Sequence, residues 1–115
     1  MNRHELVRLM VLNSICDGYE NVDQCILGDV AKDGAECGLT IERSEVVEAL
    51  AGLVEDGLAK AYLLSPTEPF CTELQGMPQV DAVEEFFETY FLITQKGMDL
   101  HLLNDGPWLL FDAND

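Results

Sequence analysis

The chain has few basic residues. Only 6 of its 115 residues are lysine or arginine, against 22 aspartates and glutamates, so its formal charge is 6 − 22 = −16. A charge of this sign repels phosphate backbones, anionic membrane surfaces and other copies of the chain. It favours solubility and basic partners.

Sequence motifs of catalysis and metal binding are also missing. There is no Gly-rich phosphate loop, no G-x-S-x-G elbow, no H-E-x-x-H pair and no calcium loop. The two histidines, His4 and His101, have no metal-ligand spacing, so we interpret them as exposed or helix-end imidazoles. A ligand or proton-shuttle role beside a neighbouring carboxylate is the alternative. We predict no enzyme activity, no catalytic residue, no metal and no cofactor.

None of the four cysteines forms a C-x-x-C pair, so we interpret them as reduced thiols. Cys16, Cys25 and Cys37 fall in predicted helices, where cysteine behaves as a small hydrophobe. Cys71 falls in a predicted loop, and a redox-sensing role is its alternative interpretation. No apolar run reaches the roughly 18 residues of a membrane span, and the N-terminus lacks an export signal's apolar core. We therefore expect a cytoplasmic protein with no membrane partner.

The strongest pattern in the chain runs from Leu39 to Leu64 and predicts a helix, a sharp stop and a strand. Ser44 or Thr40 is the expected N-cap of the helix, and Asp56-Gly57 its end, because glycine readily adopts the left-handed conformation. Residues 58–64 then alternate with the two-residue period of a strand. One apolar stripe is predicted to face the core, made of Val46, Leu50, Leu53 and Val54.

The other elements complete a single α+β domain. We predict two helices before this stretch and, after it, a loop containing prolines, a second strand and a final helix. Their expected bounds are about His4–Cys16, an Asp23-capped helix closed by Gly38, the loop Ser65–Glu85, the strand Phe86–Ile93 and a Thr94-capped helix to Leu103.

The order of these elements and two local patterns resemble the winged helix-turn-helix family. Residues 45–58 resemble its third helix with an acidic-Gly-Leu turn into the wing, and residues 91–97 resemble its strand end and T-x-K-G helix start. The resemblance implies a three-helix core, a two- or three-stranded antiparallel wing sheet and a C-terminal helix. We assign this domain to residues 1–104 and a tail, apolar and then acidic, to residues 105–115.

Members of that family usually bind DNA through the third helix. In this chain only Arg43 could reach a base, and residues 65–85 contain no lysine or arginine, so DNA binding is disfavoured. We predict a relative of transcription regulators that acts by protein–protein contact, with a basic protein as partner. The alternative is a homodimeric, sequence-specific DNA-binding regulator that uses Arg43. The predicted docking face consists of Glu45, Glu48, Glu55 and Asp56.

The first helix and the tail carry more apolar surface than one small core is expected to bury. We therefore predict a homodimer. Its expected contact residues are Leu6, Met10, Trp108, Leu109, Leu110 and Phe111.

Overall fold

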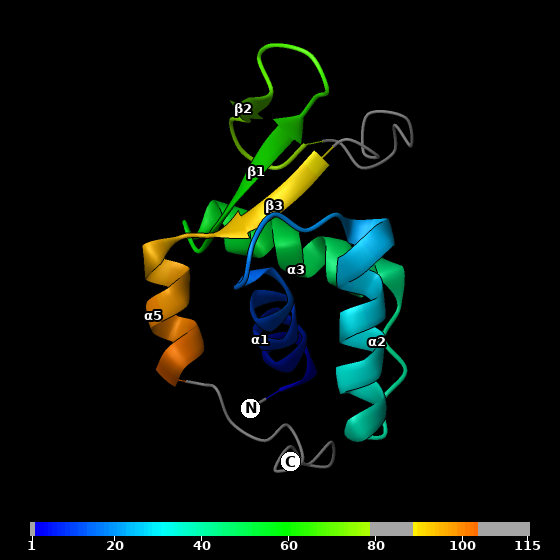
Figure 1. The fold of residues 1–115 in the computed structure, drawn as a ribbon. Helices are drawn as coiled ribbons and strands as arrows, with labels where there is room; N and C mark the ends of the chain where they lie inside the picture. The colour runs from blue at the N-terminus through cyan, green and yellow to red at the C-terminus, as the bar shows by residue number, and fades with distance from the viewer. Residues whose placement is uncertain (1, 79–88, 104–115) are drawn as a thin grey trace.

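Four α-helices and a three-stranded antiparallel sheet make up the described part of the chain, residues 2–78 and 89–103 of a computed structural model (Figure 1). The fold is therefore α+β, as predicted. The elements are α1 (Arg3–Ile15), the π-helical turn η1 (Val22–Ile26), α2 (Leu27–Glu36), α3 (Arg43–Glu55), β1 (Ala59–Leu64), β2 (Cys71–Glu73), β3 (Thr89–Ile93) and α5 (Gln95–Leu103).

Helix α1 lies at the centre of the molecule and contacts α2, α3 and α5 (Figure 1). Strand β3 and η1 also contact α1, so the helix is covered on more than one side. This explains why its sequence is apolar on more than one side. Leu6 and Met10 are both 0% exposed. The prediction that these two side chains form a dimer contact is wrong, because the single chain already buries them. The α1 core residues are Leu6, Val7, Leu9, Met10, Val11, Leu12 and Ile15.

Helix α3 ends as predicted but begins differently. Gly57 has a φ of +76° and follows the C-cap residue Asp56. At the start, the N-cap is Glu42, whose backbone N–H donates to the Glu45 carboxylate 2.8 Å away in a capping box. The expected caps Ser44 and Thr40 are wrong, because the reciprocal pairing of two glutamates satisfies the first turn instead.

The chain enters α2 through η1, and the cap of this turn is Asn21 rather than the predicted Asp23. The Asn21 side-chain oxygen accepts from two backbone N–H groups of η1, at 3.0 and 3.3 Å. Its amide nitrogen also donates to the Thr89 carbonyl, 2.9 Å away. A carboxamide accepts at its oxygen and donates at its nitrogen, whereas an ionised carboxylate can only accept, which favours asparagine over aspartate here. Glu20 adds a two-way backbone pairing with Phe91 of β3.

Strand β1 is the middle strand of the sheet, with β3 on one side and β2 on the other. The antiparallel pairing with β3 runs from Ala59↔Ile93 to Leu63↔Thr89, in agreement with the antiparallel sheet expected from the sequence. The prediction that residues from Ser65 onward form only a loop is wrong for β2, which pairs with the other edge of β1. Pro66 and Pro69 stay outside the paired residues, so neither interrupts the ladder. Residues 86–88 of the predicted second strand lie outside the described residues.

The first turn of α5 packs on the turn that ends α3. Thr94 donates its hydroxyl to the Gly57 carbonyl (2.7 Å) and its N–H to the Leu58 carbonyl (3.0 Å). The same hydroxyl accepts from Gly97 N–H at 3.1 Å, the helix cap expected of Thr94. A Cβ on Gly97 would overlap the Leu58 carbonyl oxygen and lie 2.7 Å from a side-chain carbon of Ile93. Glycine is therefore required at this contact.

We expect Gly97→Ala to lower the free energy of unfolding by about 1–3 kcal/mol or more, because the added methyl group meets backbone that cannot yield. Gly28→Ala is the matched control, since no atom lies within 4 Å of the added Cβ and alanine favours the helix by up to about 1 kcal/mol. Urea denaturation of both variants measures the two effects. Equal stabilities would contradict the close packing at Gly97.

Candidate protein-docking surface

The four carboxylates predicted for the docking face divide into two pairs. Glu45 accepts two hydrogen bonds from Arg3 of α1, at 2.7 and 3.1 Å. Asp56 accepts one from Arg8, at 2.7 Å. These contacts join α1 to α3 at both ends of α3. Glu45 and Asp56 therefore each form an ion pair that joins α1 to α3.

Both contacts stabilise the ionised carboxylate. The hydrogen bond from the Arg3 guanidinium, followed by that from the Glu42 N–H, lowers the pKa of Glu45 below its ordinary value of 4.5. The hydrogen bond from Arg8 likewise lowers the pKa of Asp56. The two negative charges are thus kept at physiological pH, each beside an arginine.

The remaining carboxylates, Glu48 and Glu55, lie seven residues apart on α3 and are both exposed. Seven residues are nearly two turns, so the two side chains share one face about 10 Å apart. Between them lie Ala51 and Gly52, and the Arg8 guanidinium lies against Gly52, where an added Cβ would come within 3.1 Å of it. Within residues 2–78 and 89–103, neither glutamate forms an ion pair. We call Glu48, Ala51, Gly52 and Glu55 the acidic strip.

A hollow of about 350 Å³ opens beside the acidic strip, between α1 and α3. Glu48 forms part of its wall. Arg3, His4, Val7 and Glu45 line the rest. Since Arg3 is already bound to Glu45, Glu48 is the wall carboxylate left for an incoming cation.

Arg43, the residue predicted to contact DNA in the alternative, is held by a carboxylate of η1. Its guanidinium donates to both oxygens of Asp23, at 3.0 and 3.2 Å. This hydrogen bonding raises the pKa of Arg43 above its ordinary value. A bidentate pair of this kind uses the donor geometry with which arginine would read guanine.

The other basic side chains are also next to acceptors or carboxylates. Lys60 pairs with Glu73 across the sheet at 2.7 Å, and Lys96 donates to the Asp56 carbonyl at 2.8 Å. Lys32 lies beside Asp33, whose pKa is raised by burial while the Asn13 hydrogen bond and the Lys32 charge oppose the rise. All six basic residues of the chain belong to the described part, and four of them, Arg3, Arg8, Arg43 and Lys60, form ion pairs there.

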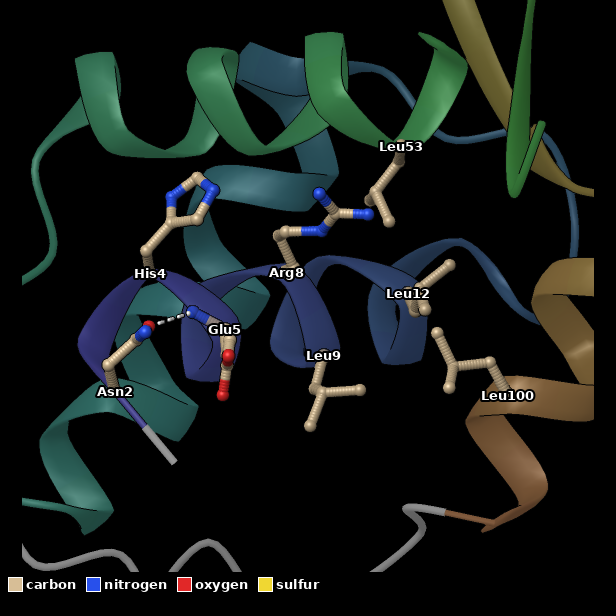
Figure 2. A pocket seen from close by; sticks show the side chains of 8 residues that line it. All are labelled: Asn2, His4, Glu5, Arg8, Leu9, Leu12, Leu53 and Leu100. Atoms are coloured by element: carbon tan, nitrogen blue, oxygen red, sulfur yellow. Dashed lines mark hydrogen bonds between the residues drawn. The ribbon is translucent and has the colours of Figure 1, made fainter. Parts of the chain in front are cut away.

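A second hollow, of about 470 Å³, lies between α1, α3 and α5 (Figure 2). Four leucines contributed by these three helices make it apolar, and the first turns of α1 supply a polar end. In Figure 2 the side chain of Leu100 points from α5 toward Leu12 of α1. The pattern of each helix alone could not reveal this groove, because its walls come together only in the fold. Its apolar lining is Leu9, Leu12, Leu53 and Leu100.

The histidines and cysteines singled out in the sequence lie at separate places in the fold. No group of three histidine, cysteine or carboxylate side chains among the described residues could hold a metal ion. His4 is exposed, while His101 is buried near the end of α5. Cys71 is exposed as predicted, and its hydrogen bond with Tyr19 raises the pKa of the tyrosine. No helix of residues 2–78 and 89–103 has the length and apolarity needed to span a bilayer.

Comparisons of the chain with protein-family models, with characterised proteins and with solved structures found no match. Function is therefore inferred from the chemistry of the surface. The predicted tail contacts, Trp108–Phe111, lie outside the described residues.

We expect Glu45→Gln to lower the free energy of unfolding at pH 7 by about 0.5–1 kcal/mol, through loss of the ion pair with Arg3, since the Gln oxygen can still accept from the Glu42 N–H. Because the folded-state pKa of Glu45 is depressed, its contribution is present above the unfolded value and is lost as the pH falls through the folded one. The gap between wild type and variant should therefore shrink below pH 4.5.

Glu48→Gln serves as the control for this measurement, because it removes an exposed carboxylate of the same helix that has no ion pair among the described residues. Its effect should stay within about 0.5 kcal/mol across the pH range. Denaturant titrations at several pH values distinguish the two variants, and a similar loss in both would contradict the structural role of Glu45.

Proposed function

We propose that the chain is a non-enzymatic winged-helix module, a relative of transcription regulators, that binds a basic protein through the acidic strip. One observation carries this proposal. The arginines nearest α3 are bound to the chain's own carboxylates, while Glu48 and Glu55 point outward without such partners in the described structure.

The arrangement of the elements supports a winged-helix architecture. Three helices precede a hairpin of β1 and β2, and β3 leads into the closing helix α5. The hairpin is closed by the hydrogen bond from Ser65 N–H to the Phe70 carbonyl (2.9 Å) and extends away from the helices (Figure 1). In this interpretation α3 occupies the recognition-helix position and the hairpin is the wing.

The charge of the strip favours a basic partner over any other. Its two carboxylates lie about 10 Å apart, comparable with the Debye length at 0.1 M salt, so each acts on a partner nearly independently. The overall charge of −16 adds long-range attraction for a cationic surface.

The DNA-binding alternative receives no support from these contacts. To bind phosphates, Arg43 would have to leave Asp23, and Lys60 would have to leave Glu73. Each broken ion pair would leave an unpaired carboxylate that repels the DNA. The predicted homodimer also cannot use Leu6 and Met10 as contacts, because both are 0% exposed in the single chain. Self-association through the tail stays a prediction that the described residues do not test.

The acidic strip can be tested by charge reversal with a matched control. We expect Glu48→Lys/Glu55→Lys to weaken binding to an arginine-rich helical peptide about tenfold or more, or about 1.4 kcal/mol. The control Glu36→Lys/Glu68→Lys changes the net charge equally but alters exposed glutamates on α2 and in the hairpin turn. Titration calorimetry measures both. Equal weakening would mean that net charge, and not the strip, attracts the peptide.

A DNA titration distinguishes the two functions. We expect no binding of duplex DNA at low salt, because four of the six basic side chains are paired with carboxylates of the chain and the net charge of −16 repels phosphates. Fluorescence anisotropy with labelled duplexes of varied sequence is the measurement. Binding that weakens steeply with added salt, and that Arg43→Glu abolishes, would favour the DNA-binding regulator instead.

A further inference from the structure

The groove between α1, α3 and α5 is an apolar surface that the proposed function does not use. It lies beside α1 and α5, whereas the acidic strip faces outward from α3. Leu12 and Leu53 are fully buried at its base, and Leu9 and Leu100 form its sides. At the α1 end the lining becomes polar with Asn2 and His4. The groove therefore has one apolar half and one polar half.

A second hollow adjoins the groove along α5. It has a volume of about 460 Å³, shares Leu100 with the groove and adds two leucines, Leu58 and Leu103, beside the charged residues Asp56, Lys96 and Asp99. Leu103 is 84% exposed, as the last described residue of α5. A leucine so exposed, one turn after Leu100, is a surface on which further apolar chain can pack.

We propose that this groove binds the chain's own C-terminal segment, Trp108–Phe111. The sequence continues from Leu103 through three polar or small residues and a proline to Trp-Leu-Leu-Phe. Five residues reach at most about 17 Å from Leu103, and Leu100 lies only about 5 Å back along α5, so the tail can enter the groove without moving the helix.

The lengths of the groove and the segment also agree. From Leu12 to Asn2, α1 rises about 15 Å, and the four residues of Trp108–Phe111 span at most about 14 Å when extended. The apolar segment thus covers the leucines before the polar end begins.

Charge also favours a tail that runs from the leucines of the groove toward the first turn of α1. After Phe111 the sequence is Asp-Ala-Asn-Asp, and these residues would follow the groove to the first turn of α1. That end presents His4, Arg8 and the positive end of the α1 dipole, although Glu5 is also present and Arg8 is paired with Asp56. If the tail lay in the opposite direction, the acidic residues after Phe111 would lie against the leucines of the groove.

The chain's own tail is favoured over a second copy for two reasons. Each copy carries a charge of −16, which opposes association. A tail tethered five residues from the groove has an effective concentration in the millimolar range, which no second copy reaches in dilute solution. The proposal is independent of the acidic strip and would stand if that strip bound nothing.

Trp108 is the only tryptophan, so its fluorescence in the intact chain reports the position of the tail. We expect blue-shifted emission and slow acrylamide quenching relative to a free tryptophan amide, independent of protein concentration. Leu100→Ala should lower the ratio of docked to undocked tail roughly tenfold and raise the quenching rate accordingly. Leu102→Ala is the control, since Leu102 is 65% exposed on α5 and lines neither hollow.

A second measurement guards against misfolding of the variants. Circular dichroism checks their helix content, and in the unmodified chain nuclear Overhauser contacts should join the Trp108 indole to methyl groups of Leu9 and Leu100. Quenching as fast as that of the free amide, equal effects of the two alanine variants, or indole contacts elsewhere would overturn the proposal. Protection that appears only at high protein concentration would assign the groove to the tail of a second copy.

Discussion

The contact between the first turn of α5 and the turn that ends α3 is the constraint on which the other parts depend. Gly57 reverses the chain, Thr94 binds the carbonyls of Gly57 and Leu58, and Gly97 allows the two backbones to touch. Through this contact α3, β1 and α5 meet at one point. It fixes the end of the acidic strip at Glu55 and the α5 wall of the groove, so both surfaces are placed by the same few backbone groups.

The small number of basic residues links stability to function. With only six lysines and arginines, this chain uses Arg3 and Arg8 to join α1 to α3, and Arg43 to join α3 to η1. Each contact that secures a helix pairs one of these few cations with a carboxylate. Because acidic residues outnumber basic ones by 22 to 6, the carboxylates exceed the cations available to pair with them.

The sequence predicted what depends on neighbouring residues and missed what depends on distant ones. The apolar stripe of α3, its glycine stop and the Thr94 cap were correct, because period and turn chemistry are local. The pairing of Glu45 with Arg3 spans 42 residues, and that of Asp56 with Arg8 spans 48, so no local pattern indicates them. A three-residue strand such as β2 has too little periodicity to be recognised. The groove was missed for the same reason, since α1, α3 and α5 each contribute only part of it.

The buried side chain of Asn21 bears on the order in which the molecule assembles. Its bond to the Thr89 carbonyl closes a loop of 68 residues, while its bonds to η1 close loops of two and three. Short loops form before long ones because less chain entropy is lost. The entry to α2 can therefore form from local contacts, whereas the bond to the Thr89 carbonyl requires β3 to be in place. One side chain thus connects the start of η1 to the sheet, so a substitution at Asn21 would disturb both.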